Sequence, residues 1–292
     1  LTASEVDLAA LAQLAGNLPF DAGTRLALQE FAPRGKVSDF KAGWTGDSEK
    51  LATWHGSARF ADTALQARGL LPGFTAVSGS IEASHEGGSA SISGRAATLD
   101  LPRVFPEPRI ALDQFDARVR WKVAGEQVSV ELQKVGFANA DIAGSVEGRY
   151  ATRPQSAGDI DISGNFQRGK VSEVWRYLPF VVGESVREWI RASLVDGQGS
   201  NIRLRMKGDL HEFPWAHDKN GEFDVSAAFS GARLHYAPQW PALHDIVGDL
   251  RFHGERMTIR ARRANFGALA VKDASAEIAD LTVHDDARLQ VK

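Results

Sequence analysis

Apolar and polar residues alternate with period two over much of this 292-residue chain. In the run from Arg118 to Val123, every second side chain is apolar and the residues between are basic. This alternation is typical of a β-strand with one apolar and one solvated face. The residues that it places on apolar faces of successive strands, and that we expect to form one continuous apolar stripe, are Val119, Trp121, Val123, Val128, Val130, Leu132, Ile160, Ile162, Ile202, Leu204, Met206, Phe223 and Val225.

Turn signals separate the alternating runs. They are Ala124-Gly125-Glu126, Gly208-Asp209, Ser230-Gly231 and His253-Gly254-Glu255, and Gly87-Gly88 is read in the same way. A spacing of roughly ten residues is typical of an antiparallel meander, and a clean in/out alternation favours antiparallel pairing. The sequence therefore predicts a mainly β fold: a long, twisted antiparallel sheet curled into an apolar groove.

Few segments have helical periodicity. We expect helices near residues 4–15, where Ser4 is the predicted cap, near 24–31 and near 184–194. In the last of these, Val186, Trp189, Ile190 and Leu194 share one face. This face is predicted to pack on one end of the apolar side of the sheet, as a cover or a lid.

An internal repeat is visible in the sequence. Leu18-Pro-Phe-Asp-Ala-Gly23 matches Leu178-Pro-Phe-Val-Val-Gly183, and 72–81 resembles 241–250 in the same order. Long repeats indicate tandem modules that continue one another's sheet. We expect one β-groove module over 1–168 and a second over 169–292. The chain begins at Leu1 and ends inside an alternating pattern, which predicts an interior piece of a longer protein, with any targeting or anchoring segment outside it.

Composition narrows the function. The chain has 43% hydrophobic and 24% charged residues, a formal net charge of −3 and no cysteine. The balanced charge argues against nucleic-acid binding, which needs a concentrated basic surface. Without cysteine, disulfides, thiol nucleophiles and thiolate metal sites are excluded. No apolar stretch of about 18 residues occurs, so no segment is predicted to span a membrane.

Catalytic motifs with a specific spacing are missing from the sequence. The eight histidines are scattered, without the paired spacing that would bring two imidazoles to one metal. Asp159 and Asp161 share one face of a predicted strand and could act as an acid/base pair, but the solvated side of a strand is the favoured interpretation. We therefore expect no enzyme activity, no metal and no cofactor.

Three aromatic and proline-rich segments stand out: Trp175-Arg-Tyr-Leu-Pro-Phe180, Gly208-Asp-Leu-His-Glu-Phe-Pro-Trp215, and Leu234-His-Tyr-Ala-Pro-Gln-Trp-Pro241, followed by Gly248-Asp-Leu-Arg-Phe252. Each is interpreted structurally as a turn that covers the end of a sheet. Their order, however, resembles that of the YhdP family of AsmA-like proteins, most specifically over 171–265 and more loosely over 1–170.

The resemblance implies a segment of a long Gram-negative periplasmic protein, anchored in the inner membrane, that carries phospholipids along a β-groove toward the outer membrane. Its expected partners are phospholipid acyl chains, the two membranes through parts outside this chain, and other envelope proteins. The resemblance brings no catalytic residues with it. Two alternatives stay open: a β-sandwich module that recognises glycan or protein, and a hydrolase on a β scaffold, for which the sequence offers no convincing nucleophile.

Overall fold

The computed structural model describes residues 1–14, 22–46, 51–69, 71–213, 215, 221–235, 239–279 and 290–291. Its strands are β1 (Thr2–Asp7), β2 (Arg34–Gly46), β3 (Leu51–Leu65), β4 (Gly73–Ser84), β5 (Gly87–Asp100), β6 (Arg109–Ala124), β7 (Gln127–Ala138), β8 (Ile142–Ala151), β9 (Asp159–Lys170), β10 (Leu194–Asp209), β11 (Gly221–Leu234), β12 (Leu243–His253), β13 (Arg256–Phe266), β14 (Leu269–Ile278) and β15 (Gln290–Val291). Its helices are α1 (Leu8–Leu14), α2 (Ala22–Phe31), α3 (Glu184–Ser193) and the 3₁₀ helices η2 (Val171–Tyr177) and η3 (Leu210–Glu212). The fold is mainly β, as predicted.

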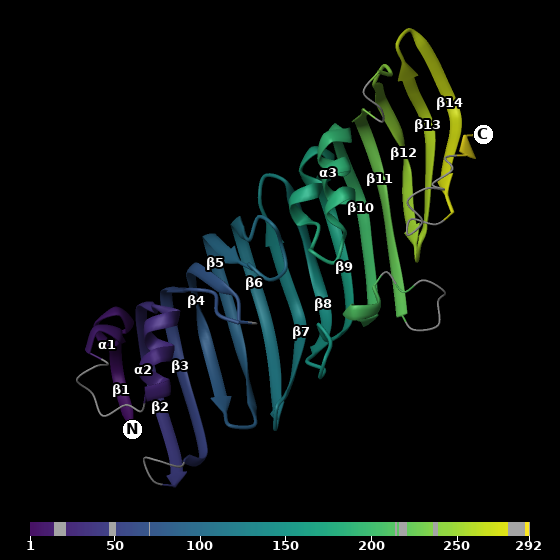
Figure 1. Ribbon diagram of the computed structural model, residues 1–292. Coiled ribbons are helices and arrows are strands. Elements are labelled where there is room, and N and C mark those ends of the chain that lie inside the picture. The colour runs from purple at the N-terminus through teal and green to yellow at the C-terminus, as the bar shows by residue number, and fades with distance from the viewer. Residues whose placement is uncertain are drawn as a thin grey trace. The chain divides into compact units, whose positions relative to one another are not determined.

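The chain divides into two compact units, 1–139 and 140–292. In unit 1, strands β1 to β7 pair antiparallel in sequence order, each with the next along the chain (Figure 1). In unit 2, strands β8 to β15 pair in the same way. Each unit is thus an antiparallel meander, the topology that the turn signals predicted. The predicted module boundary at 168/169 lies inside β9, and the existence of repeated modules stays a prediction.

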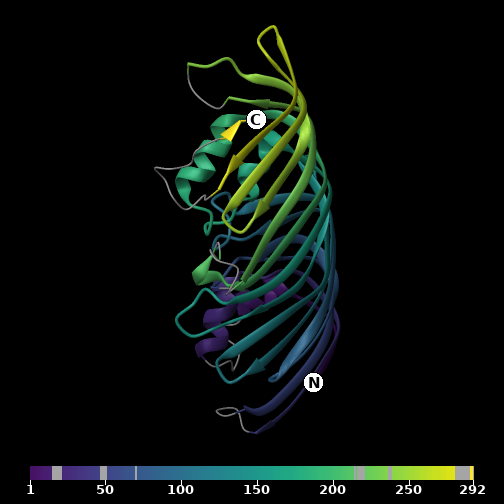
Figure 2. The same cartoon turned by 90° about the vertical axis from the view of Figure 1, so that its right-hand side faces the viewer.

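Strands in both units are interrupted by β-bulges at which a residue takes a left-handed conformation. In unit 1, φ lies between +48° and +55° at Asp39, Asp62, Ala76 and Ala96. The register between neighbouring strands shifts beside Asp39 in β2, Asp62 in β3 and Ala76 in β4. A bulge bends its strand and increases the local twist. Accordingly, the strands bend strongly along their length, and each unit is curled rather than flat (Figure 2).

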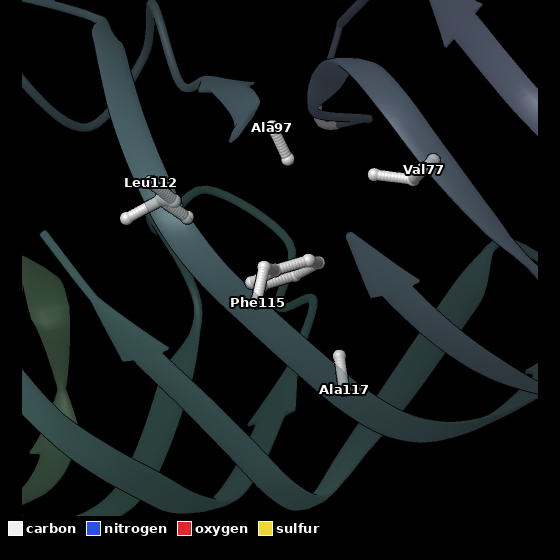
Figure 3. Close-up of a cluster of buried hydrophobic side chains, with 5 residues drawn as sticks. All are labelled: Val77, Ala97, Leu112, Phe115 and Ala117. Atoms are coloured by element: carbon white, nitrogen blue, oxygen red, sulfur yellow. The ribbon is translucent and has the colours of Figure 1, made fainter. Parts of the chain in front are cut away.

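Most of the buried apolar side chains lie where the strands bend. In unit 1 they form one cluster, drawn in Figure 3, whose members point toward a common space between β4, β5 and β6. The members are Val77, Ala97, Leu112, Phe115 and Ala117, and Val119 and Phe60 pack against them. A smaller cluster in unit 2 joins Ala232, Ile246 and Ala264. Because a single sheet can bury side chains only on the inside of its curl, these clusters mark the concave sides.

The N-terminal helix differs from its prediction. Residues 2–7 form strand β1 on β2, with Glu5 opposite Ser38, so the helix begins only at Leu8. Ser4 is therefore not the cap; Asp7 is, because its Oδ1 accepts a hydrogen bond from the backbone N–H of Ala10 at 2.9 Å. Pairing with β2 satisfies the backbone of 2–7 better than a first helical turn would.

Two of the predicted turns lie within strands. Ser230-Gly231 is not a turn but a bulge within β11, where Gly231 has φ +63°. Gly208-Asp209 belongs to β10, which ends there. The hairpins at Gly125 and Gly254 are confirmed, and each glycine has a positive φ. The Leu18-Pro-Phe turn, on which the repeat prediction rests, lies outside the described residues.

Candidate functional site

The candidate residues of unit 1 lie together on one face of the β6–β7 hairpin. Val119 is opposite Leu132, Trp121 opposite Val130, and Val123 opposite Val128. Register partners in a sheet project from the same face, so these six side chains form a single patch. All six are half-buried, whereas the basic residues between them, Arg118, Arg120 and Lys122, are exposed.

This patch belongs to an apolar face that crosses the whole of unit 1. One row of register partners runs from β1 to β7 through Val6, Val37, Phe60, Gly79, Ile92, Ala117 and Val135. Ala117 belongs to the buried cluster, and Val119 packs against it. The apolar face of unit 1 is therefore its concave side.

The candidate residues of unit 2 form a second patch across β9, β10 and β11. Met206 lies between Ile162 and Phe223, and Leu204 lies between Gly164 and Val225. The Leu204 row continues through Val225, Phe252, Met257 and Ile278 into β14. Ile160 is 8% exposed, and the other candidates, Ile202 among them, are half-buried. Whether the apolar faces of the two units join into one stripe stays a prediction.

Sequence reasoning missed several residues of these faces. Val37, Phe60 and Ile92 were not assigned to the apolar stripe, although register places them on it. The signal was weak because glycine and alanine occupy many neighbouring apolar-parity positions, such as Gly79 and Ala90. Small residues do not reveal which face they belong to.

The amphipathic helix α3 covers the sheet of unit 2 only in part. It lies on the inside of the curl, and its contacts are with η2 and β10 (Figure 2). Ile190 and Leu194 are half-buried, but Trp189 is 48% and Val186 is 38% exposed. The prediction that the whole apolar side of this helix is packed is therefore wrong for Trp189 and Val186. Their exposure follows because η2, rather than the helix itself, makes the main contact with the strands.

The carboxylate of Asp141 holds η2 in place. Its oxygens lie 3.3 Å from Lys170 Nζ and 3.0 Å from Arg176 Nη1, and the Tyr177 hydroxyl donates to it at 3.3 Å. The Asp141 side chain is only 15% exposed, so these charge-assisted contacts are partly shielded from water. Asp141 thus ties the segment that carries α3 to the end of β9.

Replacing Asp141 with alanine is expected to loosen this segment without unfolding the sheet. The substitution removes the contacts of the Asp141 carboxylate with Lys170 and Arg176, which costs roughly 2 kcal/mol of local stability. Hydrogen exchange should then accelerate about thirtyfold over 171–193, while the protection of β10 changes little. Equal acceleration in both segments would show that Asp141 supports the sheet as a whole. Asp196→Ala, an exposed carboxylate just after α3, is the matched control.

The opposite face of unit 2 carries ion pairs. Arg205 contacts Asp161 at 2.5 Å and Glu222 at 3.2 Å, and Arg251 contacts Asp224 at 2.8 Å. The hydrogen bond from Arg205 is the main cause that lowers the pKa of Asp161 below its ordinary value. The other carboxylate of the predicted pair, Asp159, pairs with Arg153 at 3.3 Å. These carboxylates are therefore balanced by basic residues on the solvated face, as the favoured interpretation had it.

Aromatic side chains close one end of the strands of unit 2. Phe213 meets both Trp215 and Phe223 edge to face, each at 5.2 Å between ring centroids. Trp215 is 2% exposed, and its Nε1 donates to the backbone oxygen of Asp209 at 2.7 Å. Phe213 and Trp215 thus cover the end of β10 and β11, as expected from the structural interpretation of this segment.

No helix among the described residues has the length and hydropathy needed to cross a bilayer. Nowhere in the described ranges do three or more histidine or carboxylate side chains come together as a possible metal site.

The sequence profile of the family described as "YhdP protein" matches residues 1–292. Among curated proteins, the "Intermembrane phospholipid transporter YhdP" of Escherichia coli (strain K12) is 23% identical over 224 residues, which cover 76% of this chain and 18% of that protein. The matched part therefore spans about a fifth of the relative's length. No solved structure matches the chain. Since the family profile covers every residue, this chain belongs to the YhdP family.

Proposed function

We propose that the apolar faces of both units bind the acyl chains of phospholipids, and that this chain is a periplasmic segment of a bridge that carries phospholipids between the inner and outer membranes. In this proposal the inner-membrane anchor lies outside the 292 residues. The chain handles lipid physically and does not transform it chemically. The relative's description as an intermembrane phospholipid transporter supports the choice of cargo.

The observation that carries the proposal is a curled single sheet layer with a half-buried apolar concave face. The strands of unit 2 form one layer, and Leu204, Met206 and Val225 keep intermediate exposure instead of being closed into a core. In a β-sandwich, such side chains would be buried against a second sheet. Each methylene of an acyl chain that leaves water contributes about 0.8 kcal/mol, so a bound lipid can cover this surface favourably.

The same geometry supports movement along the face. Contact between acyl chains and side chains such as Val119 and Leu204 is non-directional, so no single bond must break for a chain to slide. Charged residues such as Arg203 and Lys207 lie on the other side of the sheet, exposed to water. Headgroups would stay hydrated at the rim.

Helix α3 has a defined part in this proposal. Its half-buried Ile190, together with Leu194 where β10 begins, attaches it to unit 2, while Val186 and Trp189 offer apolar surface that is still accessible. The helix would act as a lid whose exposed apolar side contacts lipid when the concave face is occupied.

Native mass spectrometry of the full-length protein tests the proposal. Phospholipid that co-purifies in the intact protein, at more than one lipid per molecule, is the expected result. A protein that carries no phospholipid after gentle extraction, but retains a bound glycan or protein, would contradict it and favour a binding module.

A further inference from the structure

Aromatic rings on the apolar faces lie over glycines of the neighbouring strand. Phe60 and Gly79 are register partners, as are Trp121 and Gly88, and Phe229 and Gly248. A Cβ atom added at these glycines would lie 2.9 Å from Phe60 Cζ, 2.5 Å from Trp121 Cζ2 and 3.0 Å from Phe229 Cζ, all closer than van der Waals contact. Each ring therefore occupies the space that a side chain on its partner would need.

In unit 2 one ring covers two glycines. Phe166 is the register partner of Gly144, and it stands two residues beyond Gly164 on the same face of β9. A Cβ at Gly144 would come within 2.6 Å of Phe166 Cδ1, and one at Gly164 within 2.9 Å of Phe166 Cε2. Because the ring reaches from Gly144 on β8 to Gly164 on β9, it lies along the sheet instead of standing up from it.

These rings are on the side that the proposed function assigns to lipid. Gly79 and Phe60 belong to the apolar row of unit 1, and Gly164 is opposite Leu204 in the apolar row of unit 2. Rings packed on cross-strand glycines are known to stabilise sheets. Here the pairs have a second consequence: because the ring packs over a glycine, it adds apolar area without projecting far from the concave face of the sheet.

We propose that these glycines set the depth of the acyl-chain groove, so that glycine–aromatic pairs, and not the aliphatic residues alone, determine whether an acyl chain fits. This inference rests on the proposed function. It predicts that a small side chain in place of a paired glycine lifts the ring into the groove and narrows it, although the added side chain is itself apolar.

Gly164 gives the sharpest test because its neighbours are side chains. The three atoms nearest to an added Cβ are Phe166 Cε2 at 2.9 Å, Phe166 Cζ at 3.1 Å and Leu204 Cβ at 3.3 Å. At Gly79, Gly88 and Gly248, the nearest atom is a backbone oxygen of the adjacent strand, so substitution there would disturb the sheet itself. Gly136 is the matched control, since its added Cβ would meet only Asp116 O at 4.0 Å.

The experiment uses the full-length protein and vesicles of phosphatidylethanolamine and phosphatidylglycerol that contain a phosphatidylethanolamine with a diazirine on its acyl chain. After irradiation, lipid adducts are counted on peptides from β9, β10 and β11. In Gly164→Ala, about one methylene of the acyl chain should lose its place in the groove, which reduces labelling about fourfold. In Gly164→Val, about two methylenes should lose theirs, which reduces labelling about fifteenfold. Gly136→Ala should label like the unmodified protein, and Gly164→Val with Phe166→Ala should recover labelling because the lifted ring is gone.

The outcomes separate this inference from the function on which it rests. Absence of labelling in the unmodified protein would overturn both. Normal labelling in the unmodified protein and in both Gly164 variants would overturn the inference alone. Loss of labelling that Phe166→Ala does not restore would also overturn it, because the ring would not be the cause. If Gly164→Val lowers the unfolding temperature strongly, the inference is decided by comparing the labelling of Gly164→Ala with that of the unmodified protein.

Discussion

Replacing Leu204 with aspartate is expected to abolish phospholipid binding by unit 2 and transport by the full-length protein. Leu204 lies in the middle of the apolar row, between Gly164 and Val225. An unpaired polar group beside acyl chains costs at least about 3 kcal/mol, and a carboxylate costs more, so binding should weaken more than a hundredfold. Phospholipid content of the purified variant, together with a lipid-transfer assay between vesicles, measures the effect.

The neighbouring residue gives the matched control. Arg203 follows the opposite parity and is exposed, so Arg203→Asp introduces the same carboxylate on the solvated face. Both variants should keep the β-rich circular dichroism spectrum, because a half-buried strand position can turn a charge toward water when lipid is absent. Normal lipid content in Leu204→Asp, or equal loss in both variants, would contradict the assignment of the faces.

The largest stability effect is expected at Phe115. Its side chain is 8% exposed and belongs to the cluster at the bend of unit 1, with Val77, Ala97 and Leu112 as neighbours. Truncating a buried phenylalanine to alanine costs about 3–5 kcal/mol, through lost burial and the cavity that remains. The measurement is the free energy of unfolding in urea.

Trp189→Ala provides the comparison. A tryptophan in a core would cost as much as Phe115, but Trp189 is 48% exposed, so its replacement should cost less than about 1 kcal/mol. If both variants lost several kcal/mol, α3 would be packed more tightly than its exposure indicates. If neither did, the cluster at the bend would not be the core of unit 1.

The sequence predicted strands well where the alternation was uninterrupted. The run from Val119 to Leu132 gave the right faces and the right hairpin, because no bulge interrupts it between Val119 and Gly125. Helix α3 was also predicted nearly to its ends by its 3.6-residue periodicity. Both signals come from local patterns that tertiary contacts reinforce rather than override.

The prediction was weakest at the bulges. A residue in the left-handed conformation shifts the parity of the strand beyond it, so the period-two pattern no longer identifies the apolar face. Val77 follows Ala76, and Ala97 follows Ala96, both with positive φ, and these most buried residues were therefore missed. An alanine in the left-handed conformation is uncommon, and nothing in the local sequence predicts it.

In the candidate site, too, the period-two pattern predicted only part of the arrangement, for a different reason. The alternation within β10 alone placed Leu204 and Met206 correctly on one face. Their register partners agree: Met206 lies between two apolar residues, and Leu204 lies between a glycine and a valine. Parity could not predict that Phe166 lies over Gly144, since this requires the cross-strand register. The exposure of Trp189 was equally unpredictable, because it follows from η2, and not α3, making the main contact with the strands.

The most direct test of the account is site-specific photocrosslinking at Leu204 and at Arg203 in the full-length protein within its native envelope. These residues are adjacent in sequence but lie on opposite faces of β10, so any difference in labelling reports the face and not the location. The account predicts phospholipid adducts at position 204 and none at position 203. Equal labelling at the two positions would contradict an acyl-chain groove on the concave side.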